Sequence, residues 1–210
     1  MKYLPQILKP MFGNLKDQNL KLKDIVTYMA VRSFQNSEDK YCYPKYSQIA
    51  KLCGMSVKMI KPSLQRLNDA GLIEIKEVQS SWCKRVYCFK YDRKYQGVSL
   101  KYLLNSSLTI QEKAFIYLLA EYAHDNVSCS LKDVSERAGI NYTTCVKLFK
   151  SLKNQNLVTE AFDYDVNSND LLGWIILKSK DGIVNDLEPI SILDTNDIEN
   201  SCNSEASVTV

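Results

Sequence analysis

The chain has 210 residues, of which 45% are apolar and 24% are charged, and this is the composition of an ordinary globular protein. No apolar run approaches the ~18 residues of a membrane-spanning helix, and the N-terminus lacks the apolar core of a signal peptide. Seven cysteines without a C-x-x-C pair, and a single histidine, argue against a zinc site. We expect a soluble, cytoplasmic protein with no metal ion, no cofactor and no membrane contact.

Charge is distributed unevenly along the chain. Residues 1–103 hold 19 lysines and arginines against 8 acidic residues, a net charge of +11, whereas the remaining residues hold 8 against 16, a net charge of −8. The overall charge of +3 hides this asymmetry. A strongly basic half indicates a polyanionic partner, and nucleic acid is the first candidate.

The sequence contains an internal repeat. Residues 47–74 align without a gap with residues 132–159 at an offset of 85, so that Gly54 falls on Gly139. A repeat of this size predicts two copies of one small domain. The predicted organisation is a basic first copy (1–94), an acidic second copy (95–180) and an acidic, mobile tail (181–210).

Three helices are predicted in the first copy. Apolar residues recur at three- and four-residue steps over residues 20–34, and a shorter helix is expected over residues 46–53. Gly54 ends the shorter helix because glycine adopts the left-handed conformation of a tight turn. Ser56 is then placed to cap the third helix, which buries the apolar residues at 57, 60, 64 and 67 and ends at 68–71.

The other face of the third helix is polar and basic, with Lys58, Met59, Lys61, Gln65 and Arg66. A short helix, a glycine turn and a capped helix with a basic face form the helix-turn-helix pattern, in which the second helix enters the major groove. Two extended runs follow, over residues 72–78 and 85–91, and predict a hairpin. A hairpin in this place is a wing, whose tip would carry Trp82, Lys84 and Arg85.

Residues 23–75 contain the segment PKYSQIAKLCGMSVKMIKPSLQRLNDAGLIEI. This part of the chain resembles the winged helix-turn-helix domains of bacterial, plasmid and phage transcription regulators and of phage and plasmid replication proteins. The resemblance implies a winged-helix fold and DNA as the partner. Pro62 departs from the pattern because it lies inside the third helix, where it removes one backbone hydrogen bond and should kink the helix at a cost of ~3 kcal/mol.

The second copy uses other residues for the same local chemistry. Capping boxes are predicted at Thr109 with Glu112 and at Ser130 with Asp133. Asn141 takes the place of Ser56 as N-cap, and Asn156 takes the place of Gly71 because asparagine tolerates the left-handed conformation. A second wing is expected over residues 160–177.

The surface of the second copy leaves two interpretations open. Its expected wing carries Glu160, Asp163, Asp165 and Asp170, whose carboxylates would repel phosphate. Its third helix nevertheless offers residues that could contact DNA or a partner protein, namely Thr143, Thr144, Lys147 and Lys150. We expect this copy to pack mainly against a partner, either another subunit or the first copy.

A short extended leader is expected ahead of each copy, over residues 3–8 and 95–104. No phosphate-binding loop, dinucleotide-binding motif or nucleophile motif is present. His124 ends a predicted helix, where the negative helix end favours it without a catalytic role. We therefore predict that the protein is not an enzyme.

These patterns predict a mainly α protein with small β-hairpins (α+β), built as two tandem winged helix-turn-helix domains. The predicted DNA-binding residues are Lys45, Ser56, Lys58, Met59, Lys61, Gln65, Arg66, Trp82, Lys84 and Arg85. Within this set Lys58, Lys61 and Gln65 would read base edges, whereas Lys45, Arg66, Lys84 and Arg85 would hold phosphates.

Three functions fit these predictions. The first is a transcription regulator that binds double-stranded DNA as a homodimer, on half-sites ~34 Å apart. The second is a plasmid or phage replication initiator or replisome organiser, whose acidic second copy would recruit replication proteins. The third is a protein-binding scaffold, against which the net charge of the basic half counts.

Overall fold

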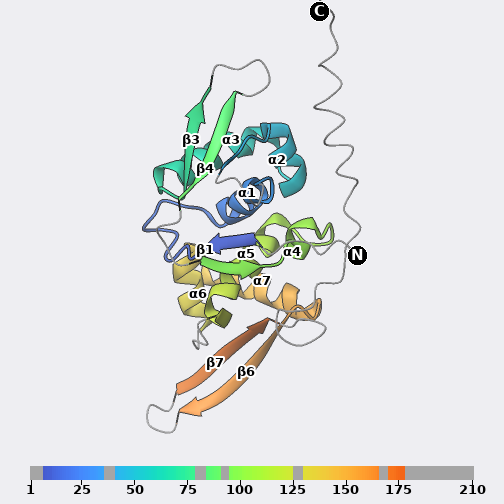
Figure 1. Cartoon of the computed structure of the whole chain (residues 1–210). Helices are drawn as coiled ribbons and strands as arrows, with labels where there is room; N and C mark the ends of the chain where they lie inside the picture. The colour runs from blue at the N-terminus through green and yellow to red at the C-terminus, as the bar shows by residue number, and fades with distance from the viewer. Residues whose placement is uncertain are drawn as a thin grey trace, which may run out of the picture.

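The computed structural model describes residues 7–35, 41–78, 84–90, 95–124, 130–165 and 170–177. Over these ranges the chain is a mixed α+β protein, as predicted, with helices and three small antiparallel sheets (Figure 1). The elements are β1 (Ile7–Pro10), α1 (Leu22–Ser33), β2 (Tyr41–Cys42), α2 (Tyr46–Cys53), α3 (Val57–Asp69), β3 (Ile73–Glu77), β4 (Arg85–Phe89), β5 (Tyr95–Val98), α4 (Lys101–Leu104), α5 (Ile110–His124), α6 (Leu131–Ala138), α7 (Tyr142–Asn154), β6 (Val158–Asp165) and β7 (Asp170–Leu177). None of the described helices is long and apolar enough to cross a membrane.

Helices α1, α2 and α3 pack together in the N-terminal half, which we define as residues 1–94. Gly54 ends α2 in the left-handed conformation, at a φ of 70°, as predicted. Strands β3 and β4 form the predicted hairpin with Ile73 opposite Phe89, and β2 pairs with the other edge of β4. The N-terminal half therefore contains a helix-turn-helix followed by a hairpin in the position of a wing.

Two side chains at the start of α3 differ from the prediction. Val57, predicted to be buried, is 48% exposed. Ser56 occupies the N-cap position, but its side chain accepts no hydrogen bond from the first turn. Pro62 lies inside α3, and the helix nevertheless continues from Val57 to Asp69. Proline has no amide hydrogen, so the carbonyl of Lys58, four residues before Pro62, lacks its helical hydrogen bond. Because both residues are exposed, water can bind this carbonyl instead.

Replacing Pro62 with alanine should raise the free energy of unfolding. Alanine restores the missing amide and removes the clash of the ring, and proline is ~3 kcal/mol less favourable than alanine inside a helix. Proline also lowers the conformational entropy of the unfolded chain, and the loss of this effect offsets ~0.4–1 kcal/mol of the gain in free energy of unfolding. Urea unfolding followed by circular dichroism measures the difference, and an unchanged or lower midpoint would contradict the expectation.

Helices α5, α6 and α7 and the hairpin β6–β7 follow one another in the C-terminal half, which we define as residues 95–180. The predicted caps are present as hydrogen bonds between Thr109 and Glu112, between Ser130 and Asp133, and from the amide of Thr143 to Asn141 Oδ1. Gly139 and Asn156 have the predicted left-handed conformation, with φ values of 62° and 55°. Local sequence therefore sets where these helices begin and end.

The two leaders pair with each other, which the sequence did not predict. The second leader is a strand only at β5, because Lys101–Leu104 form the helix α4 instead of the predicted extended run. β1 runs antiparallel to β5, with Ile7 opposite Val98 and Pro10 opposite Tyr95. The short helix α4 follows β5 and contacts α1 and α2 of the N-terminal half. Each half thus sends its leader across to the other half.

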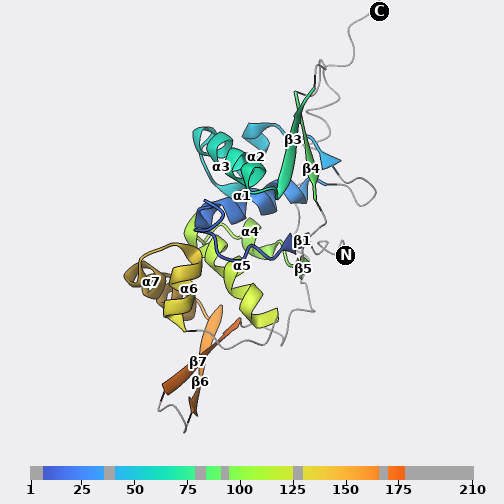
Figure 2. The same cartoon turned by 90° about the vertical axis from the view of Figure 1, so that its left-hand side faces the viewer.

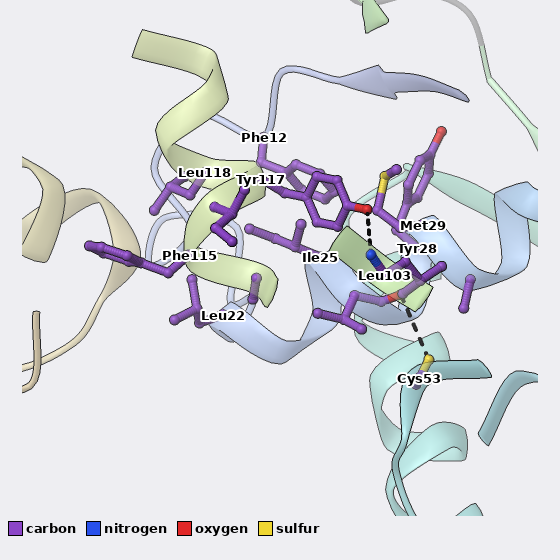
Figure 3. Close-up of a cluster of buried hydrophobic side chains, with 14 of the residues drawn as sticks. Phe12, Leu22, Ile25, Tyr28, Met29, Cys53, Leu103, Phe115, Tyr117 and Leu118 are labelled. Atoms are coloured by element: carbon purple, nitrogen blue, oxygen red, sulfur yellow. Dashed lines mark hydrogen bonds between the residues drawn. The ribbon is translucent and has the colours of Figure 1, made fainter. Parts of the chain in front are cut away.

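One core joins the two halves, because α1 packs directly against α5. Figures 1 and 2 show these two helices between the helix-turn-helix of the N-terminal half and helices α6 and α7. The close-up in Figure 3 shows Ile25 of α1 near Tyr117 of α5 within a cluster that also contains Tyr28 and Phe115, and all four side chains are buried. The Tyr117 hydroxyl accepts the N–H of Leu103 at 3.1 Å, which fixes α4 on α5.

A buried ionic cluster fastens β1 to the C-terminal half. The carboxylate of Glu121 in α5 accepts hydrogen bonds from the ammonium of Lys9, from the guanidinium of Arg137 in α6 and from the amide of Phe12. The side chains of Lys9 and Glu121 are both 0% exposed. Burial lowers the pKa of Lys9, and the negative charge of Glu121 opposes that shift.

Candidate DNA-binding surface

A basic surface covers the exposed sides of α2 and α3. The exposed lysines are Lys45, Lys51, Lys58 and Lys61. The opposite side of α3 is buried against α1 and α2 through Ile60, Leu64 and Leu67. The sequence of α2 has no acidic residue, and that of α3 has only Asp69, in its last position. The first three turns of α3 are therefore cationic toward solvent.

The three predicted base-reading residues lie on one side of α3. Lys58, Lys61 and Gln65 follow at steps of three and four residues and are all exposed. Gln65 donates one of its two amide hydrogens to Asp69 at 2.8 Å, which leaves the other hydrogen and the carbonyl oxygen for a base. Met59 is not part of this exposed side, because its side chain is half-buried and packs against the core.

Arg66 is held inside the fold instead of facing solvent as a phosphate contact. Its Nε and one terminal nitrogen donate to the two carboxylate oxygens of Asp24 at 2.7 and 2.6 Å. Asp24 is fully buried and also accepts the Ser63 hydroxyl at 2.6 Å. The same carboxylate caps α1 through the amide of Lys21. We therefore assign Arg66 to the orientation of α3 on α1 and omit it from the DNA-contact set.

Glu112 has the same role in the C-terminal half as Asp24 has in the N-terminal half. This carboxylate caps α5 through Thr109 and accepts hydrogen bonds from Ser151 at 2.5 Å and Gln155 at 3.2 Å. Desolvation opposes ionisation of Glu112, but these hydrogen bonds prevail and lower its pKa. In both halves, then, the capping carboxylate of the first helix also positions the third helix. The S/T-x-x-E spacing predicted the cap, but no local signal predicted the second contact.

The wing contributes fewer free cations than predicted. Lys84 is exposed, next to the start of β4. The guanidinium of Arg85 lies 4.6 Å from the ring centre of Tyr46 and 3.8 Å from the carboxylate of Glu77. Arg85 thus braces the wing against the start of α2. Trp82 lies outside the residues that the structure describes.

The exposed side of α7 resembles that of α3 in charge. Thr143, Lys147 and Lys150 are exposed, Thr144 is half-buried, and Tyr142 is 54% exposed. The sequence of α7 has no acidic residue. Its opposite side is buried through Cys145, Leu148, Phe149 and Leu152. The residues predicted as a second contact surface therefore share one helix and, apart from Thr144, face solvent.

The described residues hold no group of three or more histidine, cysteine or carboxylate side chains that could bind a metal ion. Cys53 and Cys145 are fully buried, as expected for small apolar side chains in helices. Burial raises the pKa of the Cys53 thiol to about 12, so it stays protonated at neutral pH.

Residues 18–73 match a family described as a helix-turn-helix domain. The matched range begins just before α1, covers α2 and α3 and ends at the first residue of β3. No curated protein matches the chain. The match supports DNA as the partner of the helix-turn-helix in the N-terminal half.

Proposed function

We propose that this protein binds double-stranded DNA in a sequence-specific manner and regulates transcription. The observation that carries the proposal is the exposed side of α3, whose first three turns carry no carboxylate and which belongs to the helix-turn-helix matched by the family. The second helix of such a motif lies in the major groove with its N-terminal residues at the base edges. A regulator of the bacterial or phage type acts on DNA in the cytoplasm.

Base and phosphate contacts are divided between two sets of residues. Lys58, Lys61 and Gln65 read bases, since lysine donates to guanine O6 and N7 and glutamine pairs with adenine. Lys45 directly precedes α2 and Lys84 directly precedes β4 of the wing; both are exposed, and they hold phosphates. Phosphate contacts supply affinity for any duplex, and base contacts supply the preference for one sequence.

The charge of the chain favours a second candidate, a replication initiator or replisome organiser. The residues after 103 carry a net charge of −8, which suits recruitment of a basic partner protein. Selection of bound fragments from a random DNA library separates the candidates. An operator-like inverted repeat supports a regulator, an array of direct repeats supports an initiator, and recovery of no duplex contradicts both.

Replacing Lys45 with alanine should weaken binding to all duplexes by a similar factor. One lost phosphate contact lowers the slope of log affinity against log salt by ~0.9. Fluorescence anisotropy with the selected duplex and an unrelated duplex, at several salt concentrations, measures this slope. Lys45→Arg keeps the charge and is the control. A slope that is equal in both variants would remove Lys45 from the phosphate-binding set.

The homodimer remains a prediction from the sequence. Its basis is that a single recognition helix reads only a few base pairs, so that two reading units are needed for a specific site. Sedimentation equilibrium of the protein at concentrations near its DNA affinity measures whether two chains associate.

A further inference from the structure

Equivalent elements of the two halves meet in pairs. The leaders β1 and β5 are antiparallel partners, and α1 packs against α5. When the same element from each unit contacts its own counterpart, the units are related by an approximate twofold axis, as in the isologous interface of a homodimer. The chain therefore builds within itself the arrangement that two identical subunits would form.

The exchanged leaders make this arrangement rigid. Lys9 and Phe12 of the N-terminal half bind Glu121 in α5, and the carbonyl of Gly13 accepts the Nε of Arg137 at 2.9 Å. The amide of Leu15 donates to the carbonyl of Arg137 at 2.9 Å. Contacts of this kind, within one shared core, hold the two halves in one relative orientation.

Helices α3 and α7 both lie away from the leader sheet (Figure 2). In Figure 2, α3 lies above α1 and α7 lies to the left of α5, while the leader sheet β1–β5 lies toward the right. Figure 1 agrees, with the leader sheet in front of α7. The hairpins β3–β4 and β6–β7 extend from opposite ends. One duplex running along the side away from the leader sheet would meet both helices.

The chemistry of α7 suits such a contact. Lys147 and Lys150 are exposed one turn apart, the sequence of α7 contains no carboxylate, and exposed Tyr142 and Thr143 stand at its N-terminus. Tyrosine and threonine hydroxyls are donors to phosphate and base edges. The neighbouring helix α6 exposes Asp133 and Glu136, which weakens this half relative to the N-terminal half but leaves the side of α7 cationic.

From these observations we infer that α7 is a second DNA-contacting helix, and that α3 and α7 of a single chain bind one duplex together. This inference depends on the proposed function of α3. It adds DNA contact to the packing of the C-terminal half against the N-terminal half, and it makes a second chain unnecessary for a two-part site. Because α3 and α7 have different side chains, the bound sequence should be two unlike half-sites.

The test uses the full chain and the duplex recovered from the random library. Native mass spectrometry gives the stoichiometry, and hydroxyl-radical footprinting gives the protected positions. We expect one chain per duplex and two protected regions about one helical turn apart, ~10 base pairs. Two chains per duplex, one chain bridging two duplexes, or a single protected region would each overturn the inference.

The double variant Lys147→Ala with Lys150→Ala identifies which helix protects which region. It should lose one region only, bind roughly tenfold more weakly and lower the salt slope by about 2. The matched control, Lys147→Arg with Lys150→Arg, keeps both charges and should keep both regions. Unchanged binding by the alanine variant overturns the role of α7 alone, whereas a wild-type chain that binds no duplex overturns the proposed function as well.

Discussion

Replacing Lys58 or Lys61 with alanine should lower the affinity for the selected duplex by about 5- to 150-fold, which corresponds to ~1–3 kcal/mol for each lost base contact. Both side chains are exposed on the side of α3 opposite its buried residues. The preference for the contacted base pair should relax at the same time, because the lost contact is the one proposed to distinguish it. Competition by duplexes with single base-pair changes measures the affinity and the preference together.

Lys51 provides the matched control for this experiment. It is an exposed lysine on α2, outside the side of α3 that is proposed to read bases. Lys51→Ala also removes one positive charge. We expect it to weaken binding to all duplexes equally, without changing the base preference. If the α3 variants keep the wild-type preference at every base pair, then Lys58 and Lys61 contribute charge alone, and α3 is not the element that reads the sequence.

Replacing Glu121 with glutamine should lower the free energy of unfolding by ~3–5 kcal/mol, because it leaves a buried charge without its partner. Lys9 is fully buried, and Glu121 is also the acceptor for Arg137 and for the amide of Phe12. Urea unfolding followed by circular dichroism measures the loss. The double variant Lys9→Met with Glu121→Gln should recover part of the stability, since it removes the unpaired ammonium.

The stability of Glu121→Gln should depend on pH in a defined direction. Burial already lowers the pKa of Lys9, and loss of the Glu121 charge removes the main group that raises it. The unfolded chain then binds more protons than the folded chain between the lowered pKa and the ordinary pKa of lysine, about 10.4. The variant should therefore regain stability as the pH rises through this range, and a deficit that is independent of pH would contradict an unpaired Lys9 charge.

Arg66 illustrates why the candidate site was only partly predictable. Its position on α3 is next to Gln65, and the sequence gives both residues the same polar character. Gln65 is exposed, whereas Arg66 lies at the edge of the buried side and reaches Asp24 on α1. The contact joins residues 42 positions apart, so no helical period reveals it. Lys58 and Lys61, on the same helix, are both exposed.

The amino-acid sequence by itself determined where the helices and the first hairpin lie. Gly54, Asn156, the capping boxes and the apolar periods act through bonds within about one helical turn, so that they have the same effect whatever the rest of the chain does. For this reason α2 begins and ends at the predicted residues.

Only the tertiary structure decided how the halves meet. The pairing of β1 with β5, the packing of α1 on α5 and the burial of Glu121 join residues that are far apart in the chain, with 112 positions between Lys9 and Glu121. Such contacts depend on which surfaces remain uncovered after the local elements have formed, and a pattern read along the sequence does not contain that information. The same contacts set the orientation of α3 relative to α7, because the core between α1 and α5 joins both halves.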